Sequence, residues 1–125
     1  MITQIGNHPI HRGMPKAWRA ADVEIYRYGR GTTENLEVIS YARDPKTKLN
    51  FPMEWTVKFG RGKVYSSTYG HLWKNQEWPP GMRCAAFQQS MVRALQWLSG
   101  NVVDNHIEAD FPTSKSVVLR VMGLD

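Results

Sequence analysis

The stretch Met53-Glu54-Trp55-Thr56-Val57-Lys58-Phe59 alternates apolar and polar side chains with the period of two that is typical of a β-strand. Gly60-Arg61-Gly62-Lys63 follows as a glycine-rich turn, and Val64-Tyr65-Ser66-Ser67-Thr68-Tyr69 returns as a second strand. A short link that contains glycine between two such runs predicts an antiparallel β-hairpin. We expect the apolar face of the first strand to be buried, and polar Glu54, Thr56 and Lys58 to face solvent.

Around this hairpin the sequence predicts one more strand and one long helix. Residues 36–42 are rich in β-branched and aromatic side chains and indicate a strand. Pro79-Pro80-Gly81 prevents an earlier helix start, and residues 82–99 carry apolar side chains at steps of three and four. This stripe consists of Cys84, Phe87, Met91, Leu95 and Leu98. Gly100 follows where a glycine can end a helix without strain.

The two ends of the chain show weaker patterns. Pro9, Gly13 and Pro15 interrupt the first 22 residues, which we expect to be loop. Residues 117–121 predict a final strand or a strap over the core. Because one helix covers one face of a sheet at most, the pattern indicates a two-layer α+β domain or part of something larger.

Composition and charge exclude several classes of protein. The 125 residues are 42% hydrophobic and 22% charged, which excludes a mostly disordered chain. No apolar run approaches the roughly 18 residues of a membrane helix, and no signal-peptide pattern begins the chain, so we expect a cytoplasmic protein. The single Cys84 excludes an intrachain disulfide. The net charge of +5 comes without a run of five like charges or a known nucleic-acid motif, so no nucleic-acid partner is expected.

Two histidines lie at positions where an imidazole can act as an acid–base group or a ligand. His71 follows Gly70 just after the second hairpin strand, where α/β folds place catalytic side chains, and an imidazole there can act as a general base. In a structural role it would cap the following turn. His8 lies in the compact loop Asn7-His8-Pro9-Ile10. It is either an acid–base or ligand group, or a loop histidine that is hydrogen-bonded to backbone.

Carboxylates and indoles add to these candidates. Asp22 and Glu24 point to the same side of an extended segment, where they could hold a metal or form salt bridges with nearby arginines. Trp73 and Trp78 lie in the loop after His71, where an indole could stack on a sugar or a base. A metal held by both histidines and a carboxylate is the weaker option, because nothing in their spacing demands it. The sequence identifies no cofactor.

In order and spacing these segments resemble the C-terminal half of the ThuA-like family, named for trehalose utilisation. The matching motifs are His8-Pro9-Ile10-x-x-Gly13-Met14-Pro15, Asp22-x-Glu24-Ile25-Tyr26, Trp55-Thr56-x-x-Phe59-Gly60-x-Gly62-x-Val64-Tyr65, Ser67-x-x-Gly70-His71 and Leu95-Gln96-Trp97. The resemblance covers residues 6–100, and the motif at residues 110–113 is also similar to some members. It divides the chain into residues 1–100, half of a ThuA-like domain, and residues 101–125, a tail with a final strand.

The resemblance implies an α/β fold of the class I glutamine amidotransferase type. This fold is a flavodoxin-like, doubly wound sheet, of which the chain would hold the C-terminal half with a β-hairpin and one long amphipathic helix. In those enzymes a cysteine works with a histidine just past a later strand and a glutamate two residues beyond it. His71 resembles that histidine, but Trp73 stands at the glutamate position and the nucleophile region would precede residue 1. Amidotransferase activity is therefore not expected.

A half domain would leave one sheet edge and one face open, so we expect the chain to be completed by its missing N-terminal half, a partner or a second copy. The resemblance further implies a role in the catabolism of disaccharides or oxidised sugars, with a carbohydrate or a sugar-derived small molecule as ligand. The expected catalytic residues are His71, His8 and Glu24, and the expected substrate-binding residues are Asp22, Tyr26, Trp73 and Trp78. The alternative is a non-catalytic module that binds a sugar or a protein. No membrane partner is expected.

Overall fold

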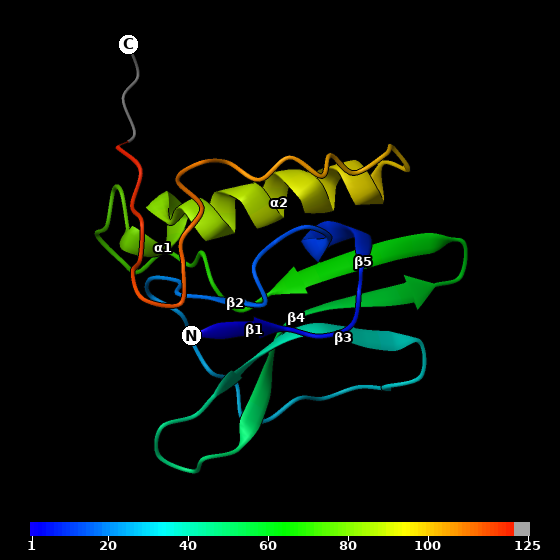
Figure 1. The fold of residues 1–125 in the computed structure, drawn as a ribbon. Coiled ribbons are helices and arrows are strands. Elements are labelled where there is room, and N and C mark those ends of the chain that lie inside the picture. Colours follow the sequence, from blue (N-terminus) through cyan, green and yellow to red (C-terminus); the bar gives the residue numbers. More distant parts are fainter. Residues whose placement is uncertain (122–125) are drawn as a thin grey trace.

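The computed structural model describes residues 1–121. These residues form a five-stranded sheet with the long helix packed along one of its faces (Figure 1). The elements in chain order are β1 (Ile2–Gln4), the 3-10 helix η1 (Pro9–His11), β2 (Ala17–Trp18), β3 (Leu36–Arg43), β4 (Asn50–Phe59), β5 (Gly62–Ser67), α1 (Pro80–Arg83) and α2 (Ala85–Leu98). Across the sheet the strand order is β2-β1-β3-β4-β5, which places the hairpin β4–β5 at one edge.

The hairpin and the strand before it are confirmed. β4 pairs with β5 from Glu54↔Ser67 to Phe59↔Gly62, and Gly60 in the turn has a φ of 56°. β3 lies on the other side of β4. Every strand pair within residues 1–121 is antiparallel. These residues therefore form an antiparallel sheet in a mixed α and β fold, whereas the strands of a doubly wound sheet are mostly parallel.

The side chains that β4 buries follow the predicted alternation at Met53, which is completely buried, but depart from it beyond that residue. Glu54 and Thr56 are buried, whereas Trp55 is only partly buried and Phe59 is 78% exposed. The prediction was wrong because hydrophobicity alone ranks a carboxylate as an outward group, and Glu54 has hydrogen-bonding partners inside the core. The Trp55 side of the sheet lies instead beneath the segment of residues 26–33.

The first 22 residues are more regular than predicted. β1 pairs with both β2 and β3, and Ile2 stands opposite Trp18 on one side and Ala42 on the other. Ile2 and Trp18 are both completely buried. The expectation of a loop was wrong because strands of two and three residues are too short to show a period.

The predicted helix over residues 82–99 is divided at Cys84. This residue has an extended backbone, ends α1 and precedes α2. It forms an isolated β-bridge with Leu119, so residues 117–121 lie as a strap against the helix start and form no regular strand. Residues 122–125 of the predicted tail lie outside the described residues.

Only the first half of the predicted apolar stripe is buried. Cys84 and Phe87 belong to the main core, but Leu95 is 58% exposed and Leu98 is also open to solvent. α2 buries small side chains further along, among them Ala94, which packs in a second cluster. We call the exposed apolar residues Val92, Leu95 and Leu98 the outer face of α2.

No helix within residues 1–121 is both long and apolar enough to span a membrane. The cytoplasmic location stays a prediction.

Candidate functional site

Three chain segments meet just beyond the end of β5 and position His71. Val23 forms an isolated antiparallel bridge with Tyr69, and the backbone N–H of Glu24 donates to the carbonyl of Thr68 at 3.3 Å. Residues 22–24 therefore run beside residues 68–70. This pairing brings Asp22, which is distant in sequence, close to His71.

The close packing before His71 depends on Gly70. Gly70 has a φ of 86°, and a side chain at this position would overlap the ring of Phe87. Gly81, at the start of the helical region, packs against the backbone of Gly70 and of Asp22. Because Gly70 has no Cβ, the ring of Phe87 can lie against the backbone directly before His71. Asp22 itself has a φ of 48°, a conformation that Asp and Asn adopt more readily than other non-glycine residues.

His71 and Asp22 form a partly exposed pair. Nε2 of His71 lies 3.8 Å from Oδ1 of Asp22, and the two side chains are 23% and 30% exposed. The imidazole also stands edge-on to the indole of Trp73, with 4.9 Å between the ring centres. Neither ring nitrogen of His71 has a hydrogen-bond partner among the described residues, although both are enclosed. Enclosed polar atoms are nearly always hydrogen-bonded in folded proteins, and the two nitrogens of His71 are an exception.

Glu24 and Tyr26 follow Asp22 closely along the chain. The hydroxyl of Tyr26 donates a hydrogen bond of 2.5 Å to the Glu24 carboxylate, and this bond raises the pKa of Tyr26. Trp73 and Trp78 are both 52% exposed. The structure thus brings together Asp22, His71 and Trp73, while Glu24 and Tyr26 form a second pair on the segment that carries Asp22.

His8 lies elsewhere. Its Nδ1 accepts a hydrogen bond from the backbone N–H of Ile10 at 3.3 Å and caps η1. Its ring packs edge-on against Trp97 near the end of α2, whereas Phe87, which contacts the His71 region, lies about 15 Å earlier along that helix. The expected grouping of His8 with His71 is therefore absent from the structure. Burial lowers the pKa of His8, which agrees with a neutral ring whose Nδ1 is an acceptor.

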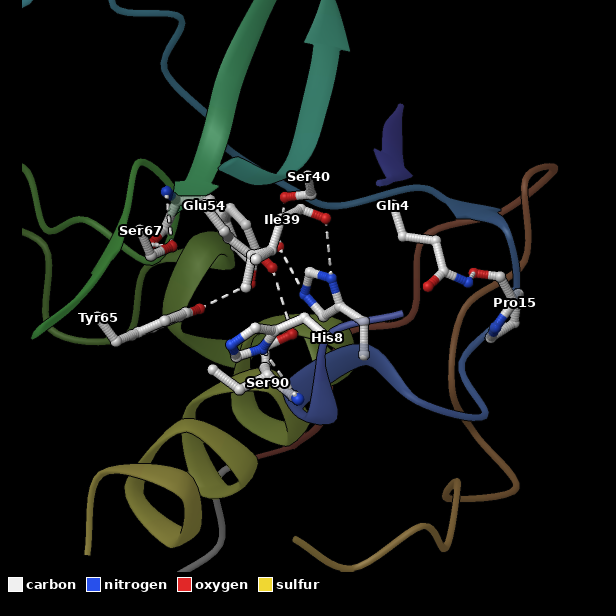
Figure 2. Close-up of polar contacts among 12 residues, drawn as sticks. Gln4, His8, Pro15, Ile39, Ser40, Glu54, Tyr65, Ser67 and Ser90 are labelled. Atoms are coloured by element: carbon white, nitrogen blue, oxygen red, sulfur yellow. Dashed lines mark hydrogen bonds and ion pairs between the residues drawn. The ribbon is translucent and has the colours of Figure 1, made fainter. Parts of the chain in front are cut away.

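A buried polar cluster lies on the inner side of the sheet, and the sequence analysis missed it (Figure 2). The Glu54 carboxylate accepts hydrogen bonds from the hydroxyls of Ser40 at 2.5 Å and Tyr65 at 2.6 Å. Nε2 of His11 lies 3.0 Å from the same carboxylate, and Nδ1 of His11 lies 3.2 Å from the carbonyl of Ile39. Both ring nitrogens of His11 therefore lie near oxygen acceptors.

This cluster connects four elements, η1, β3, β4 and β5, and its role is structural. Burial opposes the ionisation of Glu54. The electrostatic effect of His11 and the hydrogen bonds from His11, Ser40 and Tyr65 outweigh this effect and lower the pKa of Glu54. Burial and the neighbouring carboxylate raise the pKa of Tyr65 well above its ordinary value. Glu54 and His11 are both fully buried, so a ligand has no direct access to them. The only sequence signal was a carboxylate within an apolar alternation.

No group of three or more His, Cys, Asp or Glu side chains that could hold a metal forms within residues 1–121. The weaker option of a metal at His8, His71 and a carboxylate is accordingly not assembled in this arrangement.

One solved structure shares this architecture. The chain superposes on the crystal structure of a protein named as ThuA-like, from Parabacteroides merdae, with a TM-score of 0.83 and 27% sequence identity. The match covers 95% of this chain and 44% of the other, so the chain spans less than half the length of that protein. No protein-family model matches the chain, and no curated protein matches it. The resemblance to the ThuA-like family is confirmed by this structural neighbour.

Proposed function

We propose that this chain is one half of a ThuA-like domain that acts in the catabolism of disaccharides or oxidised sugars. The similarity to a ThuA-like protein over nearly the whole chain supports the assignment. In this proposal the remaining half supplies the parallel, flavodoxin-like part of a doubly wound sheet, and the residues described above form its antiparallel extension. The proposed location is the cytoplasm.

His71 is the centre of the proposed site, and the observation that carries it is the enclosed imidazole with two unpartnered ring nitrogens beside Asp22. A histidine can take a proton from a sugar hydroxyl and return it, because its two protonation states are both accessible near neutral pH. In this proposal the partly exposed ring of His71 turns so that one of its enclosed nitrogens reaches the sugar. Asp22, 3.8 Å away, would orient the ring and balance its charge once it holds a proton. Asp22 is thus proposed as a positioning residue.

The exposed indoles of Trp73 and Trp78 would supply the sugar-binding surface. Half-exposed aromatic side chains next to polar groups are typical of ligand sites, where the ring provides apolar contact and the polar groups fix the orientation. Glu24 and Tyr26 would extend this surface along the neighbouring segment, since their hydrogen bond fixes both side chains. His8, which caps η1, has a structural place in this proposal.

Completion by another chain or domain is part of the proposal. β5 is an edge strand, and the outer face of α2 exposes Val92, Leu95 and Leu98. Open strand edges and contiguous apolar faces are places where proteins associate. Light scattering of the purified chain tests this: a defined dimer supports completion by a second copy, and a monomer supports completion by the missing half.

The test of the site compares His71→Ala with His106→Ala, because His106 is an exposed histidine distant from the site and serves as the matched control. Trehalose and its keto-sugar oxidation product are the probes, with binding measured by calorimetry and turnover by mass spectrometry. We expect His71→Ala to lower turnover by about a hundredfold or more, which is typical for loss of a general base, and His106→Ala to leave it unchanged.

The companion variant is Asp22→Asn, which removes the charge and tolerates the positive φ at this position. It should lower kcat with little change in KM. Binding of a sugar without turnover would favour the alternative of a non-catalytic sugar-binding module. Binding and turnover that are both indifferent to His71→Ala would remove His71 from the function.

A further inference from the structure

A second candidate site lies on the other side of the sheet from α2. A cavity of about 600 Å³ opens between the strands β3 and β4 and the segment of residues 26–33 that crosses them. Figure 1 shows this segment on the side of β3 that faces away from α2. The volume is within the range of small-molecule sites. Neither His71 nor Asp22 lines the cavity.

The lining of the cavity is mostly apolar and aromatic. Its floor is formed by side chains of the two strands, and its wall by the crossing segment. Trp55 of β4 and the tyrosines Tyr26 and Tyr28 supply three aromatic rings, while Leu36 and Val38 supply aliphatic surface. Such walls favour a flat ring, because aromatic side chains offer large apolar faces and prefer offset stacking or edge-on packing.

Arg30 is the one charged residue that lines the cavity within the described chain. Its guanidinium makes no hydrogen bond or ion pair with residues 1–121. Thr32 and Thr33 add hydroxyl groups to the same lining, and no carboxylate is among the lining residues. A guanidinium presents several N–H donors in a planar fork that matches phosphate and carboxylate groups. The electrostatic character of the cavity is therefore that of an anion site.

The segment of residues 26–33, which forms the wall of the cavity, is anchored to the rest of the structure through Arg27. Arg27 donates two hydrogen bonds, of 3.1 and 2.8 Å, to one carboxylate oxygen of Asp44 in the β3–β4 connection. Beyond this anchor come Gly29 and Gly31, and Gly31 has a φ of 110° that glycine adopts without strain. The two glycines on either side of Arg30 let the backbone adjust, so the guanidinium can close on a bound anion.

We propose that this cavity binds a small molecule that combines a flat aromatic ring with a phosphate or carboxylate group. The ring stacks against Trp55 and the two tyrosines, and Arg30 holds the anion. The site goes beyond the proposed sugar function. It shares Tyr26 with the surface proposed there, but it uses neither His71 nor Asp22.

The test uses three probes: phenyl phosphate, which carries both features, and phenol and inorganic phosphate, which carry one each. Phenyl phosphate should bind at least about tenfold more tightly than either part, and added salt should weaken it. Its addition should shift the indole N–H signal of Trp55 in NMR spectra and leave that of buried Trp18 in place.

The matched variants are Arg30→Gln and Arg61→Gln, because both arginines stand between two glycines and Arg61 lies in the β4–β5 turn away from the cavity. Arg30→Gln should weaken the binding of phenyl phosphate by about tenfold or more, as expected for the loss of a hydrogen bond to a charged group. Arg61→Gln and His71→Ala should not change its affinity.

Three results would overturn the proposal: absence of binding, equal affinity for inorganic phosphate and phenyl phosphate, or equal losses in the two arginine variants. A loss of phenyl phosphate binding in His71→Ala would place the ligand at the other site and would also contradict it. Failure of the sugar assay with intact phenyl phosphate binding would refute only the proposed function.

Discussion

The ring of Phe87 occupies the space that a side chain at position 70 would need. Gly70 lies directly before His71, and Phe87 lies in the first turn of α2, so the contact joins the candidate site to the helix. Phe87 also packs edge-on against Tyr69, with 5.9 Å between the ring centres. The packing of Gly70 against the ring of Phe87 thus fixes the position of His71, the next residue in the chain.

Substitution of Gly70 by Ala should destabilise the protein by about 3 kcal/mol or more, because it adds left-handed backbone strain to overpacking against Phe87. Urea denaturation measures the loss. Gly29→Ala is the matched control, since a Cβ there meets nothing within 4 Å. It should stay within about 0.5 kcal/mol of the parent. Equal losses in the two variants would contradict the close packing at Gly70.

Glu54→Gln should destabilise the fold by about 3 kcal/mol, because it disturbs the buried carboxylate that accepts hydrogen bonds from Ser40 and Tyr65. The double variant His11→Leu with Glu54→Met should lose less than Glu54→Gln alone, since it replaces both members of the buried polar pair by apolar side chains. Denaturation midpoints of the two variants give the comparison. A double variant that loses as much as Glu54→Gln, or more, would contradict this prediction.

Thermal stability should fall as the pH is lowered from about 4 to about 2. Hydrogen bonds from the backbone of Lys46 and the side chains of Thr47 and Arg27 lower the pKa of Asp44 from 3.8 to about 2. A carboxylate with a lowered pKa stabilises the fold above its unfolded pKa, and this contribution is lost as the pH falls through the folded pKa. Melting temperatures of Asp44→Asn should depend less on pH in this window. An unchanged slope would show that Asp44 does not contribute.

Leu95→Ser should change the stability of the isolated chain by less than about 0.5 kcal/mol, because Leu95 is 58% exposed on the outer face of α2. Phe87→Ala, in the buried half of the same stripe, should cost about 3 kcal/mol or more. Chemical denaturation at low protein concentration measures both. A large loss in Leu95→Ser would mean that the outer face is covered in solution.

The elements that the sequence predicted well are those in which local pattern and tertiary structure agree. The β4–β5 hairpin has a glycine turn and sufficient length, and β3 has a strong β propensity. Gly100, with a φ of 79°, ends α2 as expected, and its N–H bonds to the carbonyl of Trp97. In each case the residues that determine the local structure lie within one short stretch of sequence.

The failures have long-range causes. The orientation of β4 depends on His11, Ser40 and Tyr65, which lie in three other elements and satisfy the buried Glu54. The break at Cys84 depends on its pairing with Leu119. For the candidate site, the sequence identified Asp22 and His71 separately. Their proximity depends on the Val23–Tyr69 bridge, which a period of two or of 3.6 residues cannot reveal.

The most direct test of the central claim is a trehalose titration followed at the imidazole nitrogens of the four histidines by NMR. If His71 is the centre of a sugar site, its ring signals should move in a saturable way, while those of exposed His106 and fully buried His11 should stay in place. In Asp22→Asn the His71 response should be weakened or displaced. The same titration repeated with the keto-sugar would show which form binds. Signals of His71 that stay unmoved at saturating concentrations of both sugars would contradict the account.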